Sequence, residues 1–449
     1  MLLPLTPVRF KAHAARLYGR KRAIVCGARR FTYAEFNERC DRLSQALLDL
    51  NVQPGDRVAF LSFNCHRLLE AYYAAPQISA ILLPLNIRLS PEELAWILED
   101  ASPRLLFFDP EFTPIVERLR CAAPSLRHVI SLDEPNPAWA YERGYEGLLA
   151  RAAPLAGDYT GIDENAVAEL FYTSGTTAHP KGVMLTHRNL YLHAFYVSHA
   201  MNLRDDDVGL YVVPLFHVNS WGTPHTFTLS GGAHAILRKF DPARALELIE
   251  QERVTRLQMV PAMAVALINH PEFARRDLSS VREIMLGGAP SSVALIREMD
   301  SKFPGASVCG GYGLTETSPV VMIAALKDYL RCEKKETQLR RRASAGAVIA
   351  GAEARVVDAA GNDVRPDGRE VGEVVIRSDT VMEGYWNQPE ETATALREGW
   401  LHTGDLGTID DEGYILIVDR VKDMVLSGGE NVATAEIERV IYGHPAVLE

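Results

Sequence analysis

The amino-acid sequence predicts a mixed α/β protein with a large N-terminal domain built on parallel sheets. Short apolar runs alternate with segments whose apolar residues recur three and four positions apart. This alternation of strands and helices indicates a parallel sheet covered on both faces. After about residue 345, short β-branched runs are separated by glycine, aspartate and proline, which predicts a small antiparallel β-subdomain. At 449 residues the chain exceeds the ~250–300 residues of a single core, so we expect more than one domain.

The main domain boundary is expected next to residue 421. Residues 1–421 would form the N-terminal domain, with two αβ subdomains and the β-subdomain at about 345–421. Residues 422–449 would be a hinge and the first part of an α+β C-terminal domain, with a helix from about Thr434. We expect the remainder of that domain to be absent from this chain.

The predicted elements of the first half follow one another as helix and strand. A helix is expected within 31–52, after a threonine-rich cap signal, and a buried strand follows at 57–63. Residues 66–85 and 90–109 each predict a helix followed by a strand, the second helix starting with Ser90 as cap and Pro91 as its first residue. This order fits a parallel sheet with helical crossovers.

The second half repeats the alternation before the β-subdomain begins. Short strands are expected within 253–261, 281–290 and 306–313, each ending in glycine or proline. Ligands of open parallel sheets bind beyond the carboxyl ends of strands, where these glycines fall. The charge-rich segment 328–344 is interpreted as a solvated surface helix or loop.

Composition excludes several classes of partner. The chain is 47% hydrophobic and 23% charged, as in ordinary globular proteins. Its net charge of -11 argues against a nucleic-acid partner. No run of about 18 apolar residues predicts a transmembrane helix, and no signal-peptide core is recognised. The six cysteines lack CxxC spacing, so we expect neither zinc nor disulfides, and a cytoplasmic location.

The first motif that carries chemistry is TSGTTAHPKG, which follows a predicted strand at 168–171. Backbone N–H groups and hydroxyls of such a loop suit phosphate oxygens, and Lys181 adds a positive charge. It is not the P-loop of nucleotidases, because Gly182 follows the lysine and no hydroxyl residue comes next. Taken alone, a hydroxyl-rich turn of this kind is in most cases a solvent-exposed loop.

The second motif is GGYGLTETSP, at residues 310–319. Tyr312 offers a ring for stacking on a base, Thr315 a hydroxyl for phosphate, and Glu316 a hard oxygen ligand for Mg²⁺. The alternative is a tight turn before a capped helix.

The third motif lies within 399–423, where Asp405 stands between glycines and Arg420 closes a strand. A carboxylate can accept hydrogen bonds from both hydroxyls of a ribose, and a neighbouring arginine can orient the sugar or a phosphate. The alternative is an Asx turn at Asp405 and an exposed ion pair between Asp419 and Arg420.

Together, in this order and spacing, the three motifs resemble the adenylate-forming superfamily of acyl-CoA synthetases, luciferases and adenylation domains of peptide synthetases. The resemblance covers nearly the whole chain, and the run at 213–227 resembles fatty-acyl-CoA and related medium-chain ligases. It implies ATP-dependent activation of a carboxylic acid to acyl-AMP with release of pyrophosphate, then transfer to coenzyme A. The implied small molecules are ATP, Mg²⁺ and coenzyme A.

The resemblance also implies a role for each matching residue of the nucleotide site. A mobile loop would hold the β- and γ-phosphates through Thr173, Ser174, Gly175, Thr176, Thr177 and Lys181. Adenine would lie against the backbone of Gly287, Gly288, Ala289 and Pro290, with Tyr312, flanked by Gly311 and Gly313, stacking on its face. Thr315 would contact the α-phosphate and Glu316 would bind Mg²⁺. Asp405 and Arg420 would hold the ribose.

The resemblance implies fewer residues for the sites of the acyl group and of the coenzyme A thiol. His217 would lie near the carboxylate and the thiol, and Trp221 and Gly288 would line the acyl site, although a tryptophan is also a common core residue. Lys422 would be the hinge between domains and Gly429 would line the pantetheine tunnel. Ala178 departs from the family's usual glycine, and we expect only altered loop mobility there.

One expected catalytic residue is absent. The superfamily's second catalytic lysine lies near the end of the C-terminal domain. It would be expected well after HPAVLE, the last six residues of this sequence. We therefore expect this 449-residue form to adenylate slowly and to make thioester poorly. A shortened form, an omitted end and a naturally short gene all fit the sequence.

The identity of the acid and the acceptor stays open at this point. Trp221, Met259, Val260 and Met263 favour an apolar acyl chain of medium to long length, while aryl acids fit the same residue types. Alternatives to a coenzyme A ligase are an amide synthetase, an enzyme that loads a carrier protein, and a non-catalytic nucleotide-binding homologue. The oligomeric state stays open as well, with a homodimer as one possibility because homodimers are the commonest soluble assembly.

Overall fold

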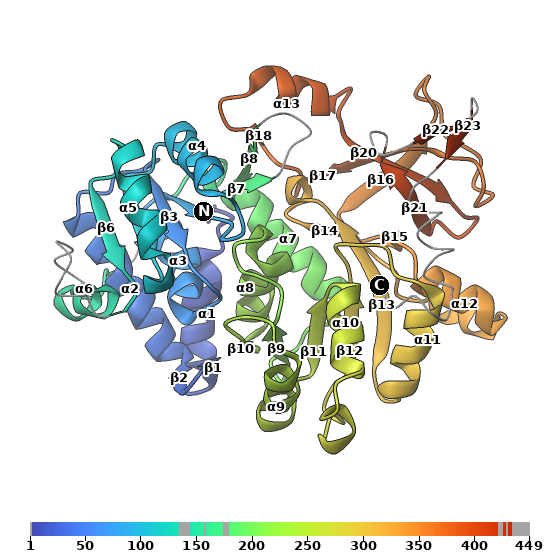
Figure 1. Ribbon diagram of the computed structural model, residues 1–449, viewed down its shortest axis with the longest axis horizontal. Helices are drawn as coiled ribbons and strands as arrows, with labels where there is room; N and C mark the ends of the chain where they lie inside the picture. Colours follow the sequence, from blue (N-terminus) through green and yellow to red (C-terminus); the bar gives the residue numbers. More distant parts are fainter. Residues whose placement is uncertain are drawn as a thin grey trace. The chain divides into compact units, whose positions relative to one another are not determined.

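The computed structural model describes residues 2–133, 144–156, 159–173, 179–420, 425–427 and 430–432. The chain divides into two compact units, Met1–Lys239 with Met382–Glu390 (unit 1) and Phe240–Val381 with Glu391–Glu449 (unit 2). Parallel sheets with helices and a separate antiparallel sheet are present, so the predicted mixed α/β class is confirmed (Figure 1). The predictions for residues 174–178, Lys422, Gly429 and the helix from Thr434 lie outside the described residues.

Unit 1 contains a seven-stranded sheet in the order β18-β8-β7-β4-β3-β5-β6. Strands β7, β4, β3, β5 and β6 are parallel, and β8 and β18 continue the sheet in antiparallel fashion. The bounds are β3 Arg57–Leu61, β4 Ile81–Pro84, β5 Leu105–Phe108, β6 His128–Ser131, β7 Val167–Thr173, β8 Lys181–Thr186 and β18 Gly384–Tyr385. The buried β-branched, leucine and phenylalanine runs of the sequence supply its central strands.

Unit 1 also holds four strands in the order β9-β10-β1-β2. Strands β9, β10 and β1 are parallel, and β2 turns back against β1. The bounds are β1 Arg22–Cys26, β2 Arg29–Thr32, β9 Val208–Tyr211 and β10 Ala233–Ile236. Eight α-helices of the described part of unit 1 are α1 Val8–Tyr18, α2 Tyr33–Asp49, α3 His66–Gln77, α4 Pro91–Ala101, α5 Thr113–Ala122, α6 Tyr145–Arg151, α7 His187–Ala200 and α8 Val218–Ser230.

Side chains at the two predicted helix starts cap the helices. Thr32 accepts from the backbone of Glu35, and Glu35 accepts from the backbone of Thr32 at 2.7 Å, which starts α2. Ser90 and Glu93 make the same reciprocal pair at α4, with Pro91 as its first residue. Leucine and isoleucine side chains of α4 pack with apolar side chains of α5, β3 and β5 in one buried cluster.

In unit 2 five strands run in the order β15-β14-β13-β12-β11. Strands β11, β12 and β13 are parallel, while β14 and β15 are antiparallel additions. The bounds are β11 Arg256–Met259, β12 Glu283–Leu286, β13 Ser307–Gly313, β14 Val320–Ile323 and β15 Ala347–Val348. The accompanying helices are α9 Pro242–Glu252, α10 Pro261–Ile268, α11 Val293–Lys302 and α12 Lys335–Arg342.

The antiparallel part of unit 2 has the strand order β16-β17-β20-β19, with β21 paired to β20. The bounds are β16 Ala352–Val357, β17 Gly372–Ser378, β19 Leu396–Arg397, β20 Trp400–Ile409 and β21 Ile415–Arg420. Helix α13 covers Pro389–Ala395, and β22 Val425–Ser427 pairs with β23 Glu430–Val432 as a separate hairpin. Val356 of β16 and Val374 and Ile376 of β17 belong to the apolar core on which this antiparallel sheet packs.

The charge-rich segment 328–344 is largely exposed or half-buried, as its composition predicted, but two of its arginines are held by acceptors of the fold. Its helix α12 presents Arg341, whose side chain is 8% exposed and pairs with Glu333, Asp410 and Asp411. Arg342 donates to Asp300 and to the carbonyl of Val308. These arginines tie α12 to its neighbours, because buried guanidinium groups need several acceptors at once.

Among the helices of the described residues, none has the length and apolar composition required to cross a membrane.

Two buried histidines of unit 1 make stability depend on pH. Burial lowers the pKa of His187 to about 4 and that of His234 to about 3. Because an unfolded histidine titrates near pH ~6.5, the unfolded chain binds more protons below that pH. The stabilisation is therefore complete above pH ~6.5 and is lost as the pH falls toward the folded values.

We expect the melting temperature to fall as the pH is lowered from 7 to 5, and His234→Gln to reduce that dependence. The His234 ring is fully buried between the Tyr211 hydroxyl at 2.6 Å and the Thr228 hydroxyl at 3.2 Å. Melting curves across this pH range measure the slope. His13→Gln at an exposed histidine is the control, and equal slopes for the two variants would contradict the prediction.

Candidate functional site

The predicted phosphate loop connects two strands of a hairpin. Strand β7 ends at Thr173, β8 begins at Lys181, and these two residues are paired across the antiparallel ladder. Ser174, Gly175, Thr176 and Thr177 lie outside the described residues. The hairpin therefore fixes both ends of the loop and sets Lys181 directly opposite the last residue of the incoming strand.

An aromatic ring positions Lys181. The Lys181 ammonium lies 5.1 Å from the centroid of the Tyr385 ring, within the range of a cation–π interaction. Tyr385 belongs to β18, which pairs with β8 at Val183. Sequence analysis missed Tyr385, because nothing in the run GYWN indicates a partner so far back in the chain.

His217 stands immediately before a left-handed turn. The five residues from Val218 to Gly222 have φ values between 35° and 84°. A left-handed conformation costs roughly 1–2 kcal/mol for each residue other than glycine, so the surroundings must hold the turn in place. His217 is exposed, and desolvation followed by the positive charge of Arg88 lowers its pKa. Trp221, predicted to line the acyl site, is 7% exposed within this turn.

Several side chains of unit 1 anchor the strand and turn around His217. The hydroxyl of Tyr72 donates to the carbonyl of Leu215 at 2.6 Å, and Asn64 accepts from the Leu215 backbone at 2.7 Å. The Ser220 hydroxyl donates to the carbonyl of Val213 at 3.0 Å. These bonds fix the backbone on both sides of His217.

In unit 2 the predicted adenine loop lies at the carboxyl end of β12. Residues Gly288, Ala289 and Pro290 are exposed, directly after the buried end of the strand. The neighbouring strand β13 is in register, with Leu286 opposite Gly310, so Gly311, Tyr312 and Gly313 continue past the same edge. Thr315, which is 9% exposed, and Glu316 follow in a short 3₁₀ turn.

Gly313 is required by close packing of the backbone. A Cβ atom at this position would lie 1.8 Å from the carbonyl oxygen of Pro319. The chain therefore folds back tightly after Tyr312, which brings Thr315 and Glu316 beside the end of β13. This explains the third glycine of the motif on steric grounds.

The carboxylate of Asp405 joins the second and third motifs. It is 3% exposed, accepts from the Tyr312 hydroxyl at 2.6 Å, and pairs with the Arg420 guanidinium at 3.1 Å. Asp405 and Arg420 face each other across β20 and β21. Burial and the Asp405 charge raise the pKa of Tyr312, so its phenol stays protonated and donates.

The residues before Asp405 hold its backbone in a fixed turn. The Asp405 backbone donates to the Thr403 hydroxyl at 3.0 Å, and that hydroxyl donates to the carbonyl of Val374 at 2.6 Å. Gly404 has a φ of 71° and donates to Glu373 at 3.1 Å. Thr403 was not among the predicted residues, although its place in the run HTGD was a usable signal.

The predicted site residues therefore fall into one group in each unit. Unit 1 carries Thr173, Lys181, His217 and Trp221, and unit 2 carries Gly287 to Pro290, Gly311 to Glu316, Asp405 and Arg420. Lys422 and Gly429 lie outside the described residues. Within the described ranges, no cluster of three or more His, Cys, Asp or Glu side chains is arranged to hold a metal ion by itself.

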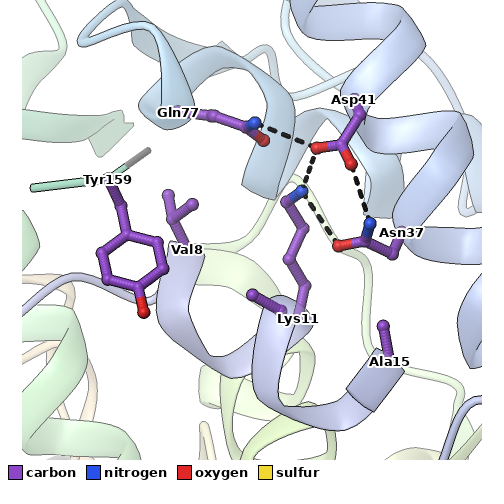
Figure 2. A pocket seen from close by; sticks show the side chains of 8 residues that line it. Val8, Lys11, Ala15, Asn37, Asp41, Gln77 and Tyr159 are labelled. Carbon is purple, nitrogen blue, oxygen red and sulfur yellow. Dashed lines mark hydrogen bonds and ion pairs between the residues drawn. The ribbon is translucent and has the colours of Figure 1, made fainter. Parts of the chain in front are cut away.

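A polar cavity of about 160 Å³ in unit 1 lies apart from these residues (Figure 2). Lys11 reaches into it from α1 and donates to Asp41 and Asn37, and Gln77 donates to Asp41 at 2.9 Å. The remaining lining residues are Val8, Ala12, Ala15 and Tyr159. None of the predicted site residues lines the cavity, so it is not the predicted site.

Comparison with known proteins identifies the family. A family model described as "AMP-binding enzyme" matches residues 10–386. The chain belongs to this family. The predicted membership of the adenylate-forming superfamily is therefore confirmed, and binding of adenine nucleotide is the family's common property.

Individual members of the AMP-binding family resemble the chain over almost its whole length. A long-chain-fatty-acid–CoA ligase of Thermus thermophilus is 39% identical, covering 98% of this chain and 81% of the relative. A feruloyl-CoA synthase of Amycolatopsis is also 39% identical, covering 96% of this chain and 82% of the relative. A solved Mycobacterium tuberculosis fatty acyl CoA synthetase superimposes with a TM-score of 0.83 at 32% identity, over 98% of this chain and 83% of that one. The expectation of an acid–thiol ligase is thus confirmed at the level of the family.

Proposed function

We propose that the protein is an AMP-forming acyl-CoA synthetase. It activates a carboxylic acid with ATP to acyl-AMP and then transfers the acyl group to coenzyme A. The observation that carries the proposal is the cluster of Tyr312, Asp405 and Arg420, which unites two motifs in one polar group of unit 2. The family membership and the resemblance to CoA ligases support the same reaction.

Unit 2 offers the features needed for adenosine. Gly288, Ala289 and Pro290 present exposed backbone at the end of β12, and Tyr312 stands beside them on β13 as the ring for stacking. Asp405 would accept hydrogen bonds from the ribose hydroxyls, because each carboxylate oxygen has a second lone pair beyond its bond to Tyr312 or Arg420. Thr315 would contact the α-phosphate.

Unit 1 offers the features needed for the triphosphate and the acid. Lys181 at the start of β8 would neutralise the β- and γ-phosphates together with Thr173 and the loop that follows it. His217 and Trp221 would contact the acid at the left-handed turn.

Glu316 suits Mg²⁺ bound with ATP. Magnesium is commonly held by one or two carboxylates, waters and substrate phosphates, so a single carboxylate next to Thr315 fits this donor set. When bound, the ion would neutralise phosphate charge.

The reaction needs charge neutralisation more than covalent help from the protein. A carboxylate oxygen of the acid attacks the α-phosphorus, the bond to the bridging oxygen breaks, and pyrophosphate leaves. Lys181 favours this step by stabilising the negative charge of the departing phosphates. The thiol sulfur of coenzyme A then attacks the acyl carbon, and AMP leaves with the bonding electron pair.

An apolar acid is proposed as the substrate. Trp221 of unit 1 is buried in the turn after His217, which favours a hydrocarbon chain over a charged group there. The relatives named above act on a long-chain fatty acid and on ferulate, so aliphatic and aryl acids belong in the same test. The cytoplasm is the proposed location, since the described cysteines are not in disulfides.

A panel of carboxylic acids tests the proposal. ATP–pyrophosphate exchange is measured for fatty acids of increasing length and for benzoate and ferulate, and the products are then analysed with coenzyme A, an amine or a carrier protein as acceptor. We expect exchange with apolar acids and thioester formation only with coenzyme A. Absence of exchange with every acid would contradict the proposed function, and acylation of an amine or a carrier protein would change the acceptor.

A further inference from the structure

A buried polar cluster links the central sheet of unit 1 to the left-handed turn after His217. Glu169 lies on β7 between β4 and β8 and is fully buried. One carboxylate oxygen is 2.7 Å from Nε2 of His225, and the other accepts from the side-chain amide of Asn219 at 2.8 Å. His225 and Asn219 are 1% and 0% exposed.

Asn219 connects Glu169 to the backbone of the turn. Its side-chain oxygen accepts from the backbone N–H of Gly222 at 2.6 Å, which closes the turn around Ser220 and Trp221. Its side-chain nitrogen is the donor to Glu169, so one residue connects the sheet and the turn. Gly222 fits only without a side chain, because a Cβ atom there would lie 2.4 Å from the His193 ring.

His225 holds the end of the turn from the other side. Its ring meets Tyr72 and Tyr73 edge-on, with centroids 6.0 and 5.5 Å apart. The Tyr73 hydroxyl also donates to the carbonyl of Pro224 at 2.8 Å. Glu169 is thus the common acceptor for Asn219, inside the left-handed turn, and for His225, just after it. None of the described predicted site residues contacts Glu169 through a hydrogen bond that the structure records.

We propose that Glu169 is a positioning residue for the acid site, which it acts on through Asn219 and His225. A run of left-handed residues persists only where the surroundings over-determine it. Removing the shared acceptor frees Asn219 and His225 together, and the turn can then relax. Because His217 lies immediately before this turn and Trp221 lies within it, the acid would lose its aligned position. The inference rests on the proposed function, since it assumes that these two residues meet the acid.

Kinetics of Glu169→Met test the role. Methionine has a similar volume but cannot accept either hydrogen bond. We expect the KM for the acid to rise about tenfold while the KM for ATP changes less than about twofold, since misplacement by about 1 Å is costly for a reacting group. Glu169→Gln should restore most of the acid KM, because its oxygen accepts from Asn219 and the imidazole can accept from its amide in the other tautomer.

Glu70→Met is the matched control. Glu70 is the other fully buried glutamate of the described part of unit 1, and it accepts from Arg39 and Tyr145 instead of from the turn. This variant should lower the melting temperature and leave the acid KM unchanged. An unchanged acid KM in folded Glu169→Met, or an equal rise in Glu70→Met, would overturn the inference.

A second variant keeps the test valid if Glu169→Met does not fold. Asn219→Ala removes the bond to Glu169 and the bond to Gly222, and it should raise the acid KM by a similar factor. Where both single variants fold, the double variant Glu169→Met/Asn219→Ala should raise the acid KM by much less than the product of the two single effects, because both changes act through one contact. If the effects of the two single changes on the acid KM multiply in the double variant, Glu169 and Asn219 do not act through one contact. If wild-type protein forms no acyl-adenylate with any acid, the proposed function itself fails, which is a distinct result.

Discussion

Replacing Lys181 by alanine is expected to lower kcat/KM for ATP by about a hundredfold or more, while binding of the acid stays nearly unchanged. Lys181 is paired with Thr173 at the mouth of the hairpin, and its ammonium is held 5.1 Å from the centre of the Tyr385 ring. Its charge is thus aimed at one place, where it stabilises the departing pyrophosphate. Steady-state kinetics with ATP and acid varied separately measure the two effects.

Two further variants separate charge from position. Lys181→Arg keeps the charge and should retain part of the activity, whereas Tyr385→Leu keeps the lysine and removes the ring that orients it. We expect Tyr385→Leu to weaken the use of ATP only severalfold, in line with the modest energy of a cation–π contact. Equal losses for ATP and acid in Lys181→Ala would count against the phosphate role.

The second large effect is expected at Asp405. Asp405→Ala should reduce affinity for ATP by about a hundredfold, because the ribose loses its acceptor and Tyr312 and Arg420 lose their partner. Calorimetric titration with ATP measures the affinity. Wild-type protein should also bind ATP more tightly than 2′-deoxy-ATP or 3′-deoxy-ATP, and this preference should disappear in the variant.

A carboxylate of the same β-subdomain serves as the control for Asp405. Asp410 accepts from Arg341 at 2.7 Å and from the backbone of Tyr414 at 2.8 Å, and it is not among the proposed site residues. Asp410→Ala should reduce the melting temperature without changing nucleotide affinity. If both variants bind ATP equally well, Asp405 has no part in holding the ribose.

The local features of the site were predictable because they depend on neighbours in sequence. The strand before the first motif, the glycines after β12 and the glycines in the last part of β13 follow from short apolar runs that stop at small residues, whereas the strand that starts at Lys181 was not predicted. The partnership of Asp405 with Arg420 was also expected, since both belong to one motif and two adjacent antiparallel strands bring them together.

Features that depend on distant residues could not be predicted. The bond between Tyr312 and Asp405 joins two separate motifs, and no pattern in either indicates the other. The left-handed turn at Val218 to Gly222 could not be recognised in the sequence either, because four of its five residues carry side chains that disfavour this backbone conformation. Only the buried partners in the sheet make it stable, and they lie far away in the chain.

Arg341 illustrates a different failure of local reasoning. A run of charged residues is usually solvated, and the composition of 328–344 gave no reason to expect a buried arginine. In the folded chain Asp410 and Asp411, from the turn before β21, supply carboxylates to it together with Glu333. Charge in the sequence indicates exposure only where no opposite charge is brought near by the fold.

The short strand β18 affects how the chain folds while it is being synthesised. Strand β8 is complete at Thr186, but its outer neighbour consists of Gly384 and Tyr385. At about 5–20 residues per second, the ribosome needs roughly 10–40 s to reach that point. Throughout this interval the nascent chain presents an uncovered edge of β-strand, the kind of surface that pairs with other chains. Chaperone binding during translation would therefore be needed most at β8, and would end when Tyr385 emerges.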